Sequence, residues 1–427
     1  MAGTQVSPTI GGIFNTQSFI QDHAKRSFAG MITKLMPNGN APLFALTSML
    51  SSNTAVAVEH GFFTKTMVFP SFNLTANITN TDTVFTVTST ANLLPGQIHR
   101  LEETGENVII NEVLSPTSIR VSRSMGNVAA AAVTVATDIS EAYQVGNAYE
   151  EASIRPQPLS INPIRITNLT QIFRNTWAIS GSAAETQVEV GDTMVAENRQ
   201  DCAAFHAQAI ESALIWGQKS SGMRNGQPFR TMDGLVSIVS NLAYYPPTYS
   251  TPNIHEALTT GTNYSQLEAM LNPVFDQSTD PKVANDRVIF VGGDARTVIN
   301  NIGRKSGQYQ LVDGQTSFGL QFQTFKTSRG TFRLIEHPLF NSNIHWKKNA
   351  LVVDLSSFKI AYLGNRKTMN KEFNVAGQPA VDSGVDAVGG SLLTEMTVEI
   401  HNPPANALIT NLTAANGEVI LTQEVTP

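Results

Sequence analysis

The sequence predicts a mixed α+β protein in which one long helix separates a β-rich first half from a mixed second half. The long helix is expected over residues 192–216, where apolar residues form a single stripe. Residues 73–147 are rich in Thr, Val and Asn and nearly free of helix signals, whereas helical and strand patterns alternate after residue 232. A chain of 427 residues is expected to form two or three compact units.

The long helix is defined by apolar residues that recur at intervals of three, four and seven. Asp192 is expected to cap its N-terminus and Gly217 to end it, which gives a length of roughly 37 Å at 1.5 Å per residue. The opposite face is polar and includes Glu211, so we expect only one stripe to be buried. An ordinary core helix of a globular enzyme would show the same pattern. The stripe expected in the core comprises Val195, Cys202, Phe205, Ala209, Ala213 and Trp216.

The first 53 residues contain one short helical pattern that cannot form a core alone. A turn cluster follows at residues 37–40. Too few apolar side chains are present to bury one another, so their partner surface is expected elsewhere. These side chains are Ile20, Phe28, Met31 and Leu35.

Residues 73–147 are expected to form a small β domain. Strands are predicted at residues 83–88, 107–110 and 118–122, with turns at 94–96, 104–105 and 115–116 between them. The strand that ends near Phe69 is expected to resume at Val145, so the β domain would be spliced into a longer two-stranded segment and would lie on its outer side.

The second half alternates helices and strands. A helix is expected at residues 264–275 and a strand, a turn and a helix over 288–302, while the prolines of 243–252 favour an extended loop. A β-hairpin is expected over 308–334, with turns at Asp313-Gly314 and Arg329-Gly330. A short β tail is expected at 399–427.

Composition restricts the class of protein. Charged residues make up only 15% of the chain, whereas about a quarter is typical of soluble domains. This low fraction fits a protein whose surface is largely covered by other copies of itself. A secreted or β-rich protein would also have few charged residues. The net charge of −6 and the lack of a Lys/Arg block argue against sequence-specific nucleic-acid binding. We expect no signal peptide and no membrane span.

No catalytic, cofactor or metal site is predicted. The eight histidines lack the spacing of a metal motif, and the single cysteine, Cys202, is expected to be a buried apolar residue. The turn at Gly292-Gly293 follows a strand and precedes a helix, as phosphate-binding turns do, but it lacks both glycine-rich phosphate motifs. A nucleotide-binding enzyme is therefore the weakest alternative.

The order of four segments resembles the tailed-bacteriophage major capsid proteins of the Hong Kong 97-type fold. APLFALTSML (41–50) is similar to the end of the N-terminal arm and VEHGFFTKTM (58–67) to the ascending strand of the extension called the E-loop. ITNLTQIFRNTWAI (166–179) is similar to its descending strand and the turn into the long "spine" helix, and VVDLSSFKIAYL (352–363) to the returning strand of the peripheral sheet.

The resemblance implies six regions. They are an N-terminal arm (1–53), an E-loop (54–72 and 148–167), the inserted β domain (73–147), a peripheral domain (168–230 and 357–400) with its spine helix at 192–217, an axial domain (231–356) and a C-terminal β tail (401–427). The family prototype lacks such an insertion, so contacts are carried over least securely there.

The resemblance also implies a function. The subunits would assemble as pentamers and hexamers into an icosahedral shell around double-stranded DNA, without sequence-specific binding, in a virion whose protein is made in the bacterial cytoplasm. Scaffolding and portal proteins would be partners, and a decoration protein could be added. Proteolytic removal of the arm is not expected. A modular binding protein, such as a tail or adhesion component, is the main alternative.

Contacts between subunits are expected from the arm and the E-loop. Lys65 lies where some family members form a covalent crosslink, although the match ends there. The expected contact residues are Ile20, Phe28, Met31, Leu35, Glu59, Phe63 and Lys65.

Overall fold

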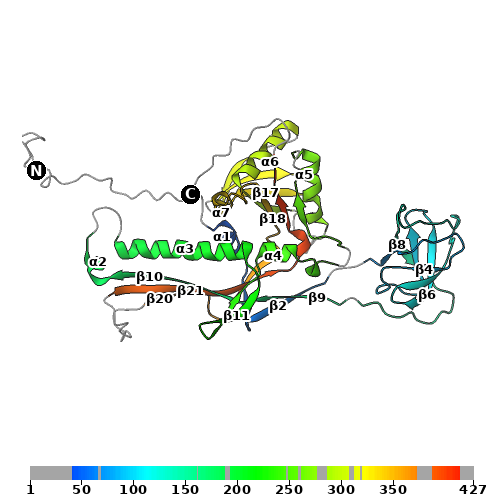
Figure 1. The fold of residues 1–427 in the computed structure, drawn as a ribbon, viewed down its shortest axis with the longest axis horizontal. Helices are drawn as coiled ribbons and strands as arrows, with labels where there is room; N and C mark the ends of the chain where they lie inside the picture. Colours follow the sequence, from blue (N-terminus) through cyan, green and yellow to red (C-terminus); the bar gives the residue numbers. More distant parts are fainter. Residues whose placement is uncertain are drawn as a thin grey trace, which may run out of the picture. The chain divides into compact units, whose positions relative to one another are not determined.

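The chain forms two compact units in the computed structural model (Figure 1). Unit 1 comprises Met1–His60, Thr167–Asn241 and Pro252–Pro427, and unit 2 comprises Gly61–Ile166 and Leu242–Thr251. The structure describes residues 41–65, 69–160, 162–187, 193–246, 249–257, 261–276, 286–306, 312–317, 320–372 and 387–413.

A five-stranded sheet in unit 1 supports the long helix. Its path runs β1 (Asn53–Ala55), β19 (Phe358–Leu363), β21 (Ala387–Ile400) and β10 (Gln171–Ser180), and β20 (Met369–Glu372) also pairs with β21. β10 and β21 are antiparallel along the whole of β10, from Gln171 opposite Met396 to Ser180 opposite Ala387. Helix α3 (Met194–Trp216) lies along these two strands (Figure 1), and the short α2 (Gly181–Glu185) follows β10.

Helix α3 ends where the sequence predicts but presents a different face to the sheet. Gly217 is its C-cap, Thr193 is its N-cap, and Asp192 lies outside the described residues. Phe205 is 62% exposed, so its predicted burial is wrong. Among the other predicted core residues, Cys202 is buried as expected, Ala209 is exposed, and Val195, Ala213 and Trp216 are partly buried. The buried residues are Cys202, His206, Ile210, Glu211, Leu214 and Ile215.

The difference arises because two polar residues belong to the buried stripe. Apolar periodicity places Glu211 on the outer face and gives no reason to bury the polar ring of His206, but both side chains make hydrogen bonds that permit burial. The His206 ring lies 2.8 Å from Asn175 Oδ1 on β10 and 2.8 Å from Thr394 Oγ1 on β21. Burial lowers the pKa of His206. The helix is thus attached to both strands by hydrogen bonds as well as by apolar packing.

A seven-stranded sheet forms the second part of unit 1. Its order is β13 (Ile254–Glu256), β22 (Ala407–Thr410), β18 (Ala350–Val353), β14 (Asp286–Val291), β17 (Thr331–Glu336), β16 (Leu320–Lys326) and β15 (Val312–Ser317). Helices α5 (Tyr264–Leu271) and α6 (Gly293–Ser306) pack on it, and the 3-10 turn η3 (Asn272–Phe275) continues α5. The predicted helix at 264–275, the predicted strand, turn and helix over 288–302, and the Arg329-Gly330 turn are confirmed.

Two sequence predictions are wrong in this region. Residues 352–363 are not one strand, because the hydroxyl and amide of Ser356 bond to Asp354 in a turn, and β18 and β19 join different sheets. Asp313 and Gly314 lie inside β15, where the pairing with β16 shifts register, and not in a turn. The β structure predicted for the C-terminal segment is present as β22, a buried apolar strand that lies between β13 and β18 inside the sheet.

Unit 2 contains a six-stranded all-β sheet. Its order is β3 (Ser71–Asn73), β8 (Glu141–Asn147), β5 (Gln97–Leu101), β6 (Asn107–Ser115), β7 (Ser118–Ser122) and β4 (Val84–Thr86). A bridge between Leu74 and Val87 links the two edge strands, and the sheet encloses an apolar core. The expected strands at 83–88, 107–110 and 118–122 correspond to β4, β6 and β7. Val145 lies in β8 of this sheet, so the E-loop does not resume there.

Two paired segments complete the described strands. β2 (Glu59–Thr64) pairs with β9 (Ile164–Leu169), as expected for the two E-loop strands, and β11 (Ser220–Arg224) pairs with β12 (Gln227–Thr231). The second pair, which the sequence did not predict, is a hairpin between α3 and α4 (Leu235–Ser240).

We expect Ile210→Ala to lower the free energy of unfolding of the unassembled subunit by about 2–5 kcal/mol, because a fully buried side chain leaves a cavity. Phe205→Ala, on the same helix, should change it by no more than about 0.5 kcal/mol, because that ring is exposed. Urea unfolding followed by tryptophan fluorescence measures both. Equal losses would show that the buried stripe is assigned incorrectly.

We expect the sheet of unit 2 to lose stability in mild acid. His99 on β5 is fully buried 5.2 Å from the Phe72 ring, and burial lowers its pKa from 6.5 to about 4. As the pH falls, His99 therefore takes up a proton at a higher pH in the unfolded chain than in the folded one. The contribution of neutral His99 to folding stability, about 3 kcal/mol at most, is present above pH 6.5 and is lost as the pH falls toward 4.

Hydrogen exchange of residues 71–147 in the full chain, corrected for intrinsic rates, measures this loss. His99→Phe removes the titrating group and should flatten the pH dependence over that range. An equally steep dependence in the variant would assign it to other groups.

Candidate functional site

The base of the β2–β9 extension is held by one buried carboxylate. Glu399 on β21 is 1% exposed, and both of its oxygens accept hydrogen bonds of 2.9 Å from Asn53 Nδ2 on β1. The Nε2 atom of His60 on β2 lies 2.7 Å from one oxygen, and Nε2 of His401 lies 2.8 Å from the other. One side chain thus connects the first residues of the extension to the five-stranded sheet.

The electrostatics favour the ionised form of Glu399. Burial alone would raise the pKa of this carboxyl, but hydrogen bonds from His401, Asn53 and His60 outweigh it and hold the pKa at about 2. The carboxylate is therefore charged at neutral pH. Its four donor contacts use the acceptor capacity of both oxygens.

A second buried carboxylate holds helix α1 (Pro42–Ser48) against α3. The amides of Leu43 and Phe44, in the first turn of α1, donate to the two oxygens of Glu211 at 2.8 and 2.7 Å. A carboxylate is stabilised at this position because it satisfies free helix amides and faces the positive end of the helix dipole. Pro42, the first helical residue, has no amide hydrogen to satisfy.

His337 completes this contact from the end of β17. Its Nδ1 accepts a hydrogen bond from the Leu339 amide, at the start of α7 (Pro338–Ser342), so Nε2 carries the proton and donates to Glu211 at 2.7 Å. Both side chains are completely buried, and the ring stacks on Phe340 at 4.7 Å. Glu211 therefore joins α1, α3 and the seven-stranded sheet.

The structure describes three of the seven predicted contact residues. Phe63 is 63% exposed on β2, next to the buried Phe62, and Glu59 and Lys65 are also exposed. Side chains therefore alternate along β2, as in a strand with one buried face. The other four, Ile20, Phe28, Met31 and Leu35, lie outside the described residues.

Sequence reasoning missed the residues that anchor these segments. Nothing in the sequence spacing of His60, His337 and His401 indicates that their rings contact buried carboxylates. One signal was available, because Glu395 and Glu399 are the only charged residues of β21, a strand that is buried along most of its length. Charged residues in a buried strand require partners, so each indicated a bonded carboxylate.

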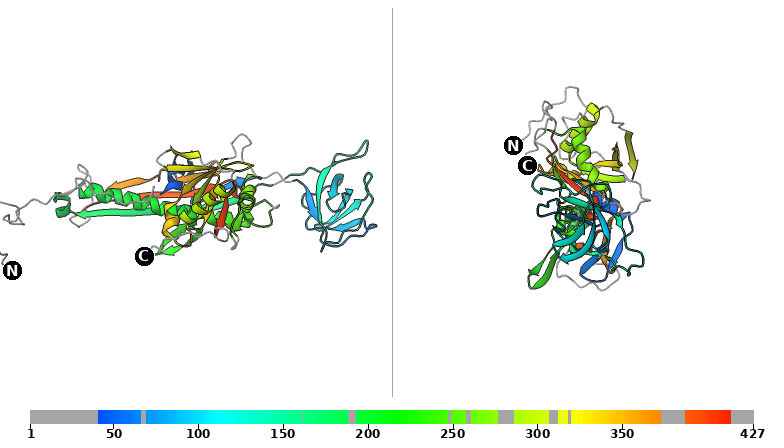
Figure 2. Two further views of the ribbon diagram at one scale, coloured as in Figure 1. Left: turned by 90° about the horizontal axis from the view of Figure 1, so that it is seen from above. Right: turned by 90° about the vertical axis from the view of Figure 1, so that its right-hand side faces the viewer.

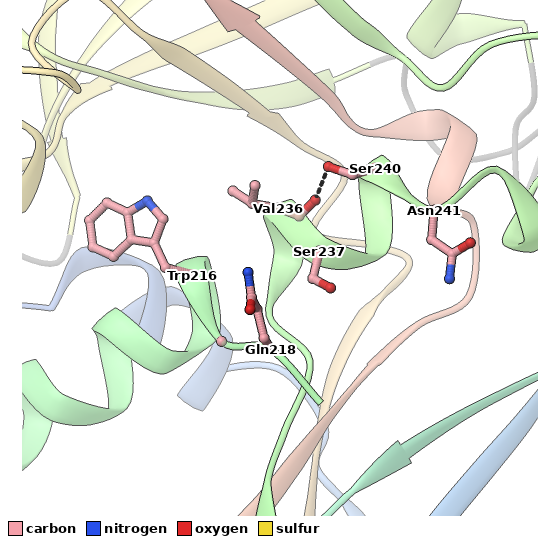
Figure 3. Close-up of a pocket in the computed structure, with 7 residues that line it drawn as sticks. Trp216, Gln218, Val236, Ser237, Ser240 and Asn241 are labelled. Atoms are coloured by element: carbon pink, nitrogen blue, oxygen red, sulfur yellow. Dashed lines mark hydrogen bonds between the residues drawn. The ribbon is translucent and has the colours of Figure 1, made fainter. Parts of the chain in front are cut away.

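A surface pocket lies beside the C-terminal end of α3 (Figure 3). Ser240 donates to the Val236 carbonyl at 2.6 Å, which is an ordinary helix contact, so this hydroxyl is not paired with a base. None of the lining residues is ionisable. The lining residues are Trp216, Gly217, Gln218, Val236, Ser237, Ser240 and Asn241.

The turn at Gly292-Gly293 is filled by the chain itself. The Gly293 amide donates to Asn341 Oδ1 at 2.7 Å, and the Ala295 amide donates to the Lys347 carbonyl at 3.0 Å. A Cβ atom at Gly292 would lie only 2.3 Å from that carbonyl oxygen, so glycine is required by close packing. These amides are not available to a phosphate group.

The described residues contain neither a metal-binding cluster nor a membrane-spanning helix. No group of three or more His, Cys, Asp or Glu side chains is arranged to hold a metal ion within the described ranges. None of the described helices combines the length and apolar character needed to cross a membrane.

Comparison with solved structures finds phage capsids and an encapsulin. The chain is similar to that of Mycobacterium phage Adephagia, with 8% identity and a TM-score of 0.41 over 95% of this chain and 97% of that one. It is also similar to the SrpI encapsulin of Synechococcus elongatus, with 12% identity and a TM-score of 0.38 over 62% of this chain and 80% of that one.

Sequence comparison gives the family. Residues 9–413 match the family described as SU10 major capsid protein. A protein named "Major capsid protein" from Pseudomonas phage PaMx41 is 36% identical over 420 residues, covering 96% of this chain and 98% of that protein. The described elements also follow the order of the Hong Kong 97-type fold, with a two-stranded extension, a spine helix and two sheets. The chain therefore belongs to the SU10 major capsid protein family, and its role is structural, as a subunit of a phage capsid.

Proposed function

We propose that this subunit assembles, as pentamers and hexamers, into a closed icosahedral shell that encloses double-stranded DNA. The observation that carries the proposal is the family match over residues 9–413. The low charged fraction of 15% supports it, because charged side chains are costly to desolvate between copies. Many modest contacts acting together make such a closed assembly much more stable than any single contact.

In the proposed mechanism, the two buried carboxylates fix the roots of the segments that reach neighbouring subunits. Glu399 fixes the start of β2, so that Glu59, Phe63 and Lys65 are presented on an anchored strand. Glu211 fixes α1, the part of the arm that follows Ile20, Phe28, Met31 and Leu35 in the sequence. Rigid roots reduce the entropy lost when a reaching segment binds.

The proposed role is packaging without catalysis or sequence recognition. A net charge of −6 disfavours tight binding to phosphates, so the DNA would be enclosed without being held at particular bases. Synthesis in the bacterial cytoplasm, a scaffolding protein, a portal and an optional decoration protein belong to the same proposal. The division of the chain into six regions, with residues 73–147 inserted in the E-loop, is also part of this proposal.

Expression of the full chain tests the proposal. Large regular particles in the electron microscope and fast sedimentation are expected, with or without a co-expressed scaffolding protein from the same phage. A discrete monomer or trimer under both conditions would instead favour the modular binding protein.

Deletion of residues 1–40 should leave a folded subunit that no longer forms stable shells. The body keeps α1 and its contact with Glu211, so the far-ultraviolet circular dichroism should be nearly unchanged. The apolar side chains of the arm would lose their partner surface on other subunits, so sedimentation should show few particles. Normal, heat-resistant shells would contradict arm exchange, whereas an unfolded product would indicate that the arm belongs to the subunit's own core.

Glu399→Gln should loosen the base of β2. The amide NH2 of glutamine cannot accept the hydrogen bonds that one carboxylate oxygen accepts, so Asn53 and His60 lose part of their anchor. Faster hydrogen exchange at residues 53–64 and less heat-resistant particles are expected. Glu112→Gln, an exposed carboxylate of unit 2, is the control. Unchanged exchange at 53–64 would show that Glu399 is not the anchor.

A further inference from the structure

The β11–β12 hairpin is exposed over nearly its whole length. All five residues of β11 are exposed, and only Arg230 and Thr231 of β12 are partly covered. Asn225 and Gly226 form its tip with φ angles of +52° and +73°, the left-handed geometry that suits a two-residue hairpin turn. An isolated two-stranded hairpin is marginally stable in water, so an exposed one requires support from its base or from a partner.

The base of the hairpin is held firmly. The backbones at Gly217 and Gly234 approach so closely that a Cβ on Gly234 would lie 2.6 Å from the Gly217 nitrogen. Asp233 Oδ1 accepts hydrogen bonds of 2.8 Å from the Lys219 amide and from Ser237 Oγ. The hairpin therefore leaves the body in a fixed direction near α4 and the C-terminal end of α3 (Figures 1 and 2).

Both faces of the hairpin carry an exposed apolar side chain. Met223 is 71% exposed and pairs with Pro228, whereas Phe229 is 43% exposed and pairs with Gly222 on the opposite face. A Cβ on Gly222 would meet nothing within 4 Å, so the space beside the Phe229 ring is open. A partner could cover apolar surface on either face.

The charge of the hairpin is opposite to that of the whole chain. Residues 220–231 contain Arg224 and Arg230 and no acidic residue, while the chain carries a net charge of −6. Arg230 lies 3.6 Å from the buried Glu395 of its own subunit. Arg224, beside the tip, has no hydrogen-bond or ion-pair partner among the described residues. An acidic surface would complement the tip, and every further copy of this chain is acidic.

We propose that the β11–β12 hairpin is an inter-subunit clamp that docks on a second copy of this chain. Met223 and Phe229 pack on apolar surface of the neighbour, and Arg224 pairs with its carboxylates. This inference rests on the proposed shell-building function, which supplies the neighbouring copy, and it adds a contact separate from the arm and the E-loop.

Photocrosslinking tests the contact directly. Met223→p-benzoylphenylalanine is introduced into the full chain, and assembled particles and the dilute unassembled subunit are both irradiated. A product of twice the subunit mass is expected from the particles only. No product from particles, or a product with a different protein, would overturn the proposal.

Assembly of hairpin variants gives a second readout. The triple variant Met223→Ser, Arg224→Glu, Phe229→Ser should yield at least tenfold fewer particles, with an unchanged melting temperature of the subunit. Met125→Ser, a 41% exposed methionine of unit 2, is the matched control and should assemble normally.

Assembly of the wild-type chain distinguishes failure of the clamp proposal from failure of the proposed shell-building function. If wild type and the triple variant assemble equally, the clamp is wrong and the shell-building function stands. If wild type forms no particles with or without a scaffolding protein, the proposed function fails and the clamp fails with it.

Discussion

The buried contact of Glu211 is the constraint on which the body of the subunit depends. This carboxylate receives two amides of α1 and the Nε2 proton of His337 while being completely removed from solvent. The partners come from two other elements, so the contact fixes α1 and the end of β17 on the spine helix α3 (Figure 1). Removing one partner of such a buried charge typically costs about 3–5 kcal/mol, because the remaining charge loses its compensation.

Local sequence signals predict part of this fold, and long-range contacts such as that of Glu211 decide the rest. The alternation of elements, the end of α3 at Gly217 and the turn at Arg329-Gly330 follow from local signals, and each was predicted. The buried face of α3 was not, because periodicity assigns Glu211 to water and Phe205 to the core. Hydrogen bonds from residues far away in the sequence allow Glu211 to be buried instead. A single sequence does not show which distant residues supply these bonds. The segment at residues 352–363 failed similarly, since apolar content alone could not show that Asp354 ends one strand and sends the next to another sheet.

The candidate assembly residues could also be predicted only in part from the sequence. An exposed Phe63 beside a buried Phe62 follows from strand alternation, so the sequence could place it on β2. The anchor of that strand could not be derived, because Glu399 is far from Asn53 and His60 in the sequence. The acidic residues within β21 showed only that some partner was needed.

These anchors suggest why the fold and the assembly can be separated in this subunit. The carboxylates Glu211 and Glu399 accept hydrogen bonds from groups of their own chain, so these two buried charges need no neighbouring subunit to compensate them. The exposed side chains include large apolar ones, such as Phe63 on β2 and Met223 on the hairpin. Apolar surface loses little when a neighbour is absent and gains roughly 25 cal/mol per Å² when it is covered. We therefore expect the subunit to fold alone, with assembly adding stability through the apolar surface that neighbours cover.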